Sequence, residues 1–528
     1  MELNGTITAG TLISPWTATV QPLKYKTAEG DEKTDVVIVG GGIAGVTTAY
    51  NLTLQDKKVI LVEDGYIGSG ESGRTTAHLV TSLDDRYYNL ERLHGKDGAR
   101  LAAESHAKAI DFVEDAIRRE NINCDFSRLK GYLFRHPSDD QGSLEKELEA
   151  AKRAGVAVQM LDHTPGIKNG NQSCLMFQQQ AQLHMMKYLE GMCEAILKRG
   201  GKIYTETHAE KIDHTGVVTD KGHKIEADHI VVATNSPVND MLAIHTKQMA
   251  YRSYVIAAKI PKGSVMQALW WDSGDHDVNN YFPPYHYVRT QPFNDTHDLL
   301  ISGGEDHLTG EKADTTPEER YAALISWTKA HFDIEEVVYR WSGQVLETMD
   351  SLAFIGRNPM DKDNVYVITG DSGNGMTHCT IGAMLITDLI LGVENKWEKL
   401  YDPSRFKILK AARGYMKDGL TVIKEFLSDL PGNDKISVIA KIKKGEAKVV
   451  QLKGEKYGVY RNDEGHLHIV SAVCPHLQCI VRWNDGEKTW DCPCHGSRFS
   501  CEGKVMNGPA NTDLPYCLAD KIAKPVKS

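Results

Sequence analysis

Several features that would take this 528-residue chain outside the ordinary globular enzymes are missing from its sequence. It has only ten cysteines, which is too few for a secreted disulfide scaffold. It has no apolar run of about 18 residues, the length that a membrane span needs, and its start lacks the basic and apolar regions of a secretory signal. Its net charge of −10 argues against nucleic acid as a partner, because phosphate binding needs a basic surface. We therefore expect a cytoplasmic protein without a membrane span.

The rest of the composition is ordinary for a globular chain with more than one domain. Apolar residues make up 41% and charged residues 25% of the sequence, and no internal repeat or low-complexity tract interrupts it. A chain of this length is long enough for about three domains. The motifs along the chain then indicate what these domains are.

The first motif is the stretch "DVVIVGGGIAGVTTAYNLTLQDKKVILVE" at residues 35–63. An apolar strand runs into Gly40-x-Gly42-x-x-Gly45, a helical pattern follows, and a second apolar strand ends at Glu63. The glycines allow a tight turn and let the backbone approach a pyrophosphate, while the acid is placed to accept ribose hydroxyls. A lone GxGxxG is weak evidence, but this order of strand, helix, strand and acid predicts dinucleotide binding.

A second glycine-rich turn, in "NVYVITGDSGNGMTHCTIGAMLITDLIL" at 364–391, favours FAD over NAD. The helix after this turn would point its N-terminus at the ring system and stabilise the negative charge of a reduced flavin, which nicotinamide does not carry. With "ADHIVVATNSP" at 227–237 and "LETMDSLAFIGR" at 346–357, these segments resemble the D-amino-acid oxidase-like FAD oxidoreductases. The resemblance covers roughly residues 30–405.

This resemblance implies an α/β FAD-binding (Rossmann-like) fold with an interleaved antiparallel-sheet substrate domain. An N-terminal extension of residues 1–30 would precede an oxidoreductase of residues 31–415. The FAD-binding segments are expected at about 31–95, 200–245 and 340–395, and the substrate domain at about 96–199 and 246–339. The implied FAD-binding residues are Gly40, Gly42, Gly45, Glu63, Arg74, Thr75, Gly375 and Met376.

The same resemblance favours FAD that is bound without a covalent link. Relatives that carry a covalent histidine link have this histidine nearer the position of Arg74 than that of His78. We interpret His78 as a hydrogen-bonded loop residue and Cys379, just after the second glycine-rich turn, as small buried filler.

Candidate substrate residues lie in "YFPPYHYVRT". Tyr285, Tyr287 and Arg289 alternate, so on one strand they would share a face of the sheet. Arg289 could then hold a substrate carboxylate, and the two tyrosines could line the flavin side of the site. The alternative interpretation is a sheet face with an aromatic core and a solvated arginine.

Near the end of the chain, "VCPHLQC" and "DCPCHGSRF" contain the pairs Cys474-x-His476 and Cys492-x-x-His495. A zinc finger usually carries its cysteine pair and its histidine pair in separate arms, whereas each arm here has one of each. Such mixed arms suit a [2Fe–2S] cluster in which two thiolates hold one iron and two imidazoles hold the other. Structural zinc remains the alternative.

These two loops resemble those of a Rieske domain, in particular the disulfide-bearing kind found in cytochrome bc complexes. The resemblance implies a disulfide between Cys479 and Cys494, which would be unusual in a reducing cytosol. Ser497 matches a serine that donates a hydrogen bond to the cluster, while Phe499 stands where a tyrosine hydroxyl would be. We therefore expect an intermediate reduction potential, since such hydrogen bonds raise it.

The cluster motif covers only the end of the chain. A helix is expected at 403–430, a helix end and linker at 416–435, and a small all-β Rieske domain at 436–528.

The combination predicts a flavin-dependent dehydrogenase that oxidises a small amine or amino-acid-like substrate. A flavin accepts two electrons and a Rieske cluster passes one at a time, so the pair suits electron transfer to an external one-electron acceptor protein, or from a donor.

Two alternatives remain. A reductase that supplies electrons to a partner oxygenase would need a second dinucleotide fold, and no second GxGxxG occurs. An oxygenase would itself need two histidines and a carboxylate for a mononuclear iron, and we find no such helix-spaced set. A redox sensor without turnover is the other alternative.

Overall fold

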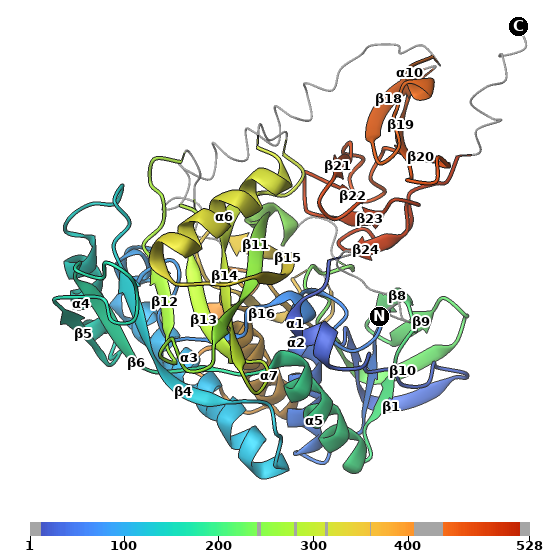
Figure 1. The fold of residues 1–528 in the computed structure, drawn as a ribbon. Coiled ribbons are helices and arrows are strands. Elements are labelled where there is room, and N and C mark those ends of the chain that lie inside the picture. Colours follow the sequence, from blue (N-terminus) through green and yellow to red (C-terminus); the bar gives the residue numbers. More distant parts are fainter. Residues whose placement is uncertain are drawn as a thin grey trace, which may run out of the picture.

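Two large sheets and a C-terminal all-β domain build the protein, for which we use a computed structural model (Figure 1). The structure describes residues 12–239, 244–278, 282–311, 315–359, 361–405, 437–452 and 454–517. The helix predicted at 403–430 and the linker predicted at 416–435 lie almost entirely outside these residues. No described helix is both long and apolar enough to cross a membrane.

The first sheet is mostly parallel and has the strand order β16-β17-β10-β1-β2-β7, with β9 and β8 added to β10. Its strands are β1 (Glu32–Val39), β2 (Val59–Val62), β7 (Lys202–Tyr204), β8 (Ala209–Asp213), β9 (Gly216–Thr219), β10 (Lys224–Val232), β16 (Phe354–Arg357) and β17 (Val365–Thr369). In β1, Val36 and Ile38 join one buried cluster while Val37 and Val39 join another. Both faces of the sheet are therefore covered, which is why β1 reads as a continuous apolar run.

Four helices pack together beside this sheet. α2 (Ile43–Thr53) contacts both α5 (Met185–Lys198) and α7 (Gly375–Leu391), and α3 (Tyr87–Glu120) packs against α7. α2 follows β1 and α7 follows β17, each after a glycine-rich turn. Because β1 and β17 run in the same direction, the N-termini of both helices lie at the same edge of the sheet, beyond the carboxyl ends of these strands. Ligands of open α/β sheets bind at this edge.

The second sheet is largely antiparallel and has the order β15-β11-β14-β13-β12-β4-β6-β3, with β5 on β6. Its strands are β3 (His78–Leu79), β4 (Ser127–Phe134), β5 (Val158–Leu161), β6 (Cys174–Gln182), β11 (Gln248–Pro261), β12 (Leu269–Asp272), β13 (Tyr287–Pro292), β14 (His297–Leu308) and β15 (Val337–Thr348). α6 (Pro317–His331) packs on β11 and β14, and α4 (Ser143–Arg153) on α3 and β5. The boundary predicted at 339/340 falls inside β15, which belongs wholly to this sheet.

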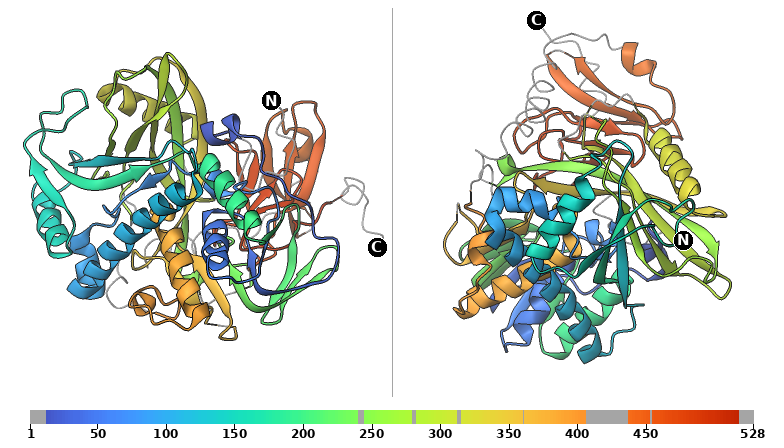
Figure 2. Two further views of the ribbon diagram at one scale, coloured as in Figure 1. Left: turned by 90° about the horizontal axis from the view of Figure 1, so that it is seen from below. Right: turned by 90° about the vertical axis from the view of Figure 1, so that its left-hand side faces the viewer.

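The C-terminal domain consists of two small antiparallel sheets that lie on one side of the rest of the protein (Figure 2). One contains β18 (Ala447–Leu452), β19 (Glu455–Arg461) and β20 (Leu467–Ser471), preceded by α10 (Ser437–Ala440). The other contains β21 (Arg482–Asn484), β22 (Thr489–Asp491), β23 (Arg498–Ser500) and β24 (Val505–Asn507). The segments with the four predicted cluster ligands join β20 to β21 and β22 to β23. The predicted fold class is confirmed.

Candidate functional site

The glycine-rich turn between β1 and α2 leaves no room for side chains. Gly40 has a φ of 111°, and a Cβ on it would lie 2.4 Å from the carbonyl oxygen of Ala233. A Cβ on Gly45 would lie 1.9 Å from the carbonyl oxygen of Gly40, so α2 can approach β1 this closely only with glycine here. The backbone amides at the start of α2, with the positive end of its dipole, therefore suit a pyrophosphate.

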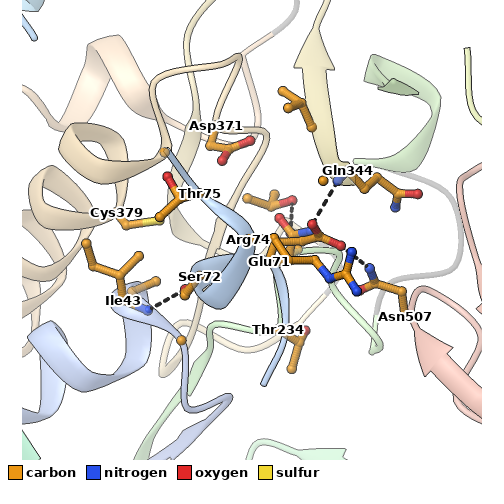
Figure 3. A pocket seen from close by; sticks show the side chains of 18 of the residues that line it. Ile43, Glu71, Ser72, Arg74, Thr75, Thr234, Gln344, Asp371, Cys379 and Asn507 are labelled. Atoms are coloured by element: carbon orange, nitrogen blue, oxygen red, sulfur yellow. Dashed lines mark hydrogen bonds between the residues drawn. The ribbon is translucent and has the colours of Figure 1, made fainter. Parts of the chain in front are cut away.

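A cavity of about 310 Å³ extends from this turn to the N-terminus of α7 (Figure 3). The predicted FAD residues that line it are Gly40, Gly42, Glu63, Arg74, Thr75, Gly375 and Met376. Gly45 lies behind the turn, where it sets the fit of α2 on β1. A single cavity thus joins both glycine-rich turns, as a long dinucleotide requires.

Glu63 lies at the end of β2, beside the turn. Its carboxylate accepts hydrogen bonds from the amides of Gly41 (2.6 Å) and Gly65 (2.8 Å). Burial raises the pKa of Glu63, while these two amides oppose the rise. An acid held in this way at the cavity wall fits the role of accepting ribose hydroxyls.

Arg74 has a structural partner that the sequence did not reveal. It borders the cavity, but its guanidinium forms an ion pair with Glu487 of the C-terminal domain at 2.8 Å and donates to the carbonyl oxygens of Ser342 and Leu12. The side chains of Arg74 and Glu487 are only 4% and 1% exposed. The charge of Arg74 is thus neutralised at a junction between domains. Arg74 still borders the cavity, and its contact with FAD stays a prediction.

Both predicted tyrosines line the cavity near the second turn. The hydroxyl of Tyr285 donates to Asp84 at 2.5 Å, and that of Tyr287 is 2.8 Å from Ser253 Oγ. A Cβ on Gly373, in the turn before α7, would lie 2.0 Å from Asp84 Oδ2. The pair of Asp84 and Tyr285 therefore packs directly against the turn that we expect to face the flavin ring.

Arg289 is a correction to the sequence analysis. It is fully buried, does not line the cavity, and donates to the carbonyl oxygens of Thr76, Ala77 and Leu183. Its guanidinium also stacks over Trp16, 5.3 Å from the ring centroid. Arg289 is neither a carboxylate ligand nor a solvated residue; it fastens the loop before β3 to the second sheet.

In place of an arginine, the cavity carries carboxylates that the sequence analysis missed. Asp84, Asp306, Glu347 and Asp371 all border it. Burial raises the pKa of Asp84 and of Asp371 to about 6 and that of Asp306 to about 7, and it also raises the pKa of Glu347. Buried acids of one sign oppose each other's ionisation, so this end of the cavity suits a positively charged ligand.

His78 and Cys379 also border the cavity. His78 Nδ1 lies 3.0 Å from Thr76 Oγ1, and burial followed by the charge of Arg289 lowers the pKa of His78 to about 3. Burial raises the pKa of Cys379 far above its ordinary value. A protonated thiol is a poor nucleophile, which argues against a covalent link between Cys379 and FAD.

The four predicted cluster ligands converge between the two loops of the C-terminal domain. The thiols of Cys474 and Cys492 are hydrogen-bonded, and this contact lowers the pKa of Cys474 to about 7. The rings of His476 and His495 have centroids 5.0 Å apart, and His495 Nδ1 is buried without a hydrogen-bond partner among the described residues. Two neighbouring thiols and two neighbouring imidazoles fit a [2Fe–2S] cluster.

A disulfide joins Cys479 and Cys494, whose Cα atoms lie 6.4 Å apart. It passes so close to the ligands that the sulfurs of Cys479, Cys492 and Cys494 lie within 4.8 Å of one another. Since Cys479 and Cys494 are bonded to each other, Cys474 and Cys492 are the two cysteines of these loops that remain available to a metal.

Ser497 lies directly beside the ligands. Its hydroxyl contacts the thiol of Cys474, which helps to lower the pKa of that group, and it accepts a hydrogen bond from the amide of Ala510 at 3.0 Å. Phe499 is fully buried and has no hydroxyl to offer. One of the two expected donors is therefore in place.

The two predicted cofactor sites meet at a polar junction. The side chain of Gln344, from β15, donates to the carbonyl oxygen of Gly496, the residue after His495, at 3.0 Å. Glu71 accepts from the amide of Gln344 and from the side chain of Asn507, both at 2.7 Å (Figure 3). Residues Val505 to Gly508, with Ala510 and Asn511, form part of the wall of the large cavity.

The histidine ligands themselves face the oxidoreductase part. The ring centroid of His245, which begins the helical turn η2 (His245–Lys247), lies 5.0 Å from that of His476 and 5.9 Å from that of His495. His245 Nε2 is also 3.0 Å from the carbonyl oxygen of Pro237. The imidazole side of the cluster site is therefore packed against a buried residue of the first domain.

Comparison with known proteins now decides the family. The profile of the FAD dependent oxidoreductases (DAO) matches residues 35–389, and that of the Rieske [2Fe-2S] domain matches residues 435–518. The chain belongs to the FAD dependent oxidoreductase family. It is an oxidoreductase that binds FAD in its first part and a [2Fe-2S] cluster in its Rieske domain.

Individual relatives agree with this assignment. YhfW of Bacillus subtilis, whose name refers to a Rieske 2Fe-2S iron-sulfur protein, is 32% identical over 94% of this chain and 95% of its own. Gamma-glutamylputrescine oxidoreductase of Escherichia coli is 25% identical over 69% of this chain and 85% of its own. The structure of glycine oxidase from Geobacillus kaustophilus has a TM-score of 0.58 at 18% identity, covering 71% of this chain and 99% of that one, and shows a shared fold.

Proposed function

We propose that the protein is an amine dehydrogenase whose Rieske domain carries electrons from the flavin site to an external one-electron acceptor. One observation supports this most strongly: the Rieske domain closes part of the wall of the FAD cavity, and its two histidine ligands pack against His245 of the FAD domain. A cluster that only stabilised its own domain would not need this placement.

The chain supplies the two binding sites. Gly40, Gly42 and Glu63 would hold the adenosine and pyrophosphate parts of FAD, and the N-terminus of α7 at Gly375 and Met376 would lie at its ring. Cys474, His476, Cys492 and His495 would hold the cluster. When bound, FAD supplies hydride acceptance and the cluster supplies one-electron transfer. The chain thus has residues to hold both cofactors that the proposed reaction needs.

The substrate class follows from the charges in the cavity. An amino-acid carboxylate would meet Asp84, Asp306 and Glu347, whereas an ammonium group would be attracted by them. The relative named gamma-glutamylputrescine oxidoreductase is consistent with an amine. We therefore place an amine, rather than a simple amino acid, in this site.

Asp306 is the proposed proton acceptor. An amine gives up hydride readily only when its nitrogen is neutral, so an ammonium must first lose a proton. Burial raises the pKa of Asp306 to about 7, and its Oδ1 is buried without a hydrogen-bond partner among the described residues. A carboxylate with a pKa near the working pH is well matched to general base catalysis.

Anaerobic mixing with a panel of primary amines, secondary amines and hydroxy acids tests this function. We expect an amine to bleach the flavin absorbance and no hydroxy acid to do so. Bleaching by none of the compounds would favour the redox sensor. NADH and NADPH are tested in the same way, and bleaching by either would favour the reductase.

A further inference from the structure

A second cavity, of about 270 Å³, adjoins the flavin cavity. Four residues line both: Asp84, Tyr285, Asp306 and Glu347. They therefore form a shared wall, with the flavin cavity on one side and a chamber bordered by α3, α4 and the segment around Phe282 on the other. A substrate that passes this wall could occupy both cavities at once.

The charges around this chamber are mainly negative. Its acidic residues are Asp84, Asp85, Asp139, Glu147, Asp306 and Glu347, and its arginines are Arg86 and Arg92. The guanidinium of Arg86 donates to the carbonyl oxygens of Leu83 and Asp272, and Arg92 bonds to the Asn89 side chain. His276 pairs with Asp139 at 3.3 Å. The chamber therefore has more acidic than basic side chains, even with these cations counted.

Two acceptors in the chamber wall are left without a donor. Glu147 is 1% exposed; its Oε2 accepts from the amides of Tyr87 and Tyr88, but its Oε1 is buried without a hydrogen-bond partner among the described residues. Ser143 is 8% exposed, and its Oγ also has no partner in that part of the chain. Buried acceptors without partners are uncommon and costly, so they indicate a donor that a ligand would bring.

The rest of the wall fits an organic cation better than a hydrated metal ion. Tyr88, Tyr251 and Phe282 all border the chamber, and the rings of Tyr251 and Phe282 meet edge to face with centroids 5.8 Å apart. Aromatic faces attract ammonium groups and accommodate methylene chains. Burial raises the pKa of Asp85 and of Glu147 to about 7, so a bound cation would also favour their ionised forms.

We propose that this second cavity binds the distal ammonium group of a linear aliphatic diamine or polyamine whose other nitrogen lies in the flavin cavity. The proposal rests on the amine dehydrogenase function and refines its substrate. It requires two cationic ends joined by a flexible apolar chain, and it assigns Glu147 and Ser143 to the distal end.

Anaerobic calorimetric titration of the dithionite-reduced holoenzyme with 1,4-diaminobutane, butylamine and 4-aminobutanoate tests the proposal without turnover, because a reduced flavin accepts no hydride. All three have an ammonium group at one end of a four-carbon chain and differ at the other end, which is a second ammonium group, a methyl group or a carboxylate. We expect the diamine to bind at least about tenfold more tightly than butylamine, which corresponds to one charge-assisted hydrogen bond, and 4-aminobutanoate to bind most weakly. Equal affinity for the diamine and butylamine would overturn the proposal.

Variants then locate the distal site. Glu147→Gln keeps the shape and the acceptor for the Tyr87 amide but removes the charge, and should reduce the preference for diamine over butylamine about tenfold. Asp85→Asn should reduce it in the same direction, which covers the case in which Glu147→Gln does not fold. Glu149→Gln, on an exposed position of the same helix, is the matched control and should leave the preference unchanged. An unchanged preference in both chamber variants would overturn the proposal.

The outcome for the distal site can be separated from that for the enzyme. Flavin bleaching by butylamine and diamine with equal affinities would leave the amine dehydrogenase intact and remove the distal site. Preferential diamine binding without bleaching would support the site and contradict the dehydrogenase.

Discussion

The two cofactor sites of this protein are built from different parts of the chain. The FAD cavity depends on main chain: glycines that exclude a Cβ and helix N-termini that point at the ligand. The cluster site depends on side chains: two thiols, two imidazoles and a disulfide between the loops that carry them. A site built from the main chain accepts many different side chains at its non-glycine positions. A site built from metal-binding side chains loses its metal when one of them is changed.

The junction between the sites follows a third pattern. It buries charges instead of apolar side chains: Glu487 lies among Arg74, Arg252 and Arg498, and all three arginines lower its pKa after burial has raised it. Buried ion pairs add little net stability compared with apolar packing, but they are costly to break. Such a junction fixes one relative placement of the two sites, which electron transfer between them would need.

The largest effect should come from separating the sites by removing one cofactor. Cys492→Ser removes a proposed thiolate ligand of iron, so we expect loss of iron and labile sulfide with FAD retained and still bleached by amine. Reduction of a one-electron acceptor such as ferricyanide should fall to background.

In the converse variant, Gly45→Ala, the new Cβ would meet the Gly40 carbonyl, so FAD should be lost while iron remains. Unchanged ferricyanide reduction by folded Cys492→Ser protein would contradict the relay.

A smaller effect is expected at the junction. Glu487→Gln leaves buried arginine charge without its carboxylate, which costs about 3–5 kcal/mol of stability when a buried pair is broken. We expect a lower midpoint in thermal unfolding and slower cluster reduction, with both cofactors still bound. Asp485→Asn, an exposed acid of the same domain, is the control and should change stability by less than about 0.5 kcal/mol. Equal effects of the two variants would show that Glu487 has no special role.

At the substrate end, the pH dependence of flavin reduction tests Asp306. Its pKa is raised to about 7, and the deprotonated form is the one that accepts a proton. The second-order rate constant of flavin reduction at low amine concentration, which reports the free enzyme, should therefore rise as the pH rises through about 7. Asp306→Asn should lower it by about 100-fold and remove that step from the profile. Stopped-flow absorbance measures both, and an unaltered profile in Asp306→Asn would assign the titration to another group.

The smallest effect concerns tuning of the cluster. Ser497→Ala removes a hydrogen bond to Cys474 and should lower the reduction potential without loss of iron, because that bond stabilises the reduced cluster. Phe499→Tyr would offer the second donor and should shift the potential upward if the buried hydroxyl reaches a sulfur. A redox titration followed by circular dichroism measures both shifts, and equal potentials in wild type and Ser497→Ala would exclude this role.

The parts of the two sites that could be predicted are those in which the functional residues lie within a few positions of one another in the sequence. The turn at Gly40 and Gly45 can be read directly, since both the tight turn and the helix contact need glycine within a few residues. The same holds for Cys474 and His476. The fold class follows because the order of strands and helices along the chain is also local.

Side chains that depend on distant contacts could not be predicted in this way. Strand alternation predicted the face of the sheet on which Arg289 lies. It could not predict what covers that face, namely the carbonyl groups of Thr76 and Leu183. The ion pair of Arg74 could not be predicted because its partner Glu487 lies more than 400 positions away in the sequence. Asp84, Asp306 and Glu347 come from three separate segments, and no motif links them.

The relay itself is tested most directly by one anaerobic experiment. Wild-type protein is mixed with a limiting amount of a reducing amine, frozen at increasing times, and examined by electron paramagnetic resonance, which detects a Rieske cluster only in its reduced state. Our account predicts that the signal of the reduced cluster grows as the flavin absorbance is bleached, with no added mediator. Flavin bleached in proportion to the added amine, beside a cluster that stays oxidised, would contradict it.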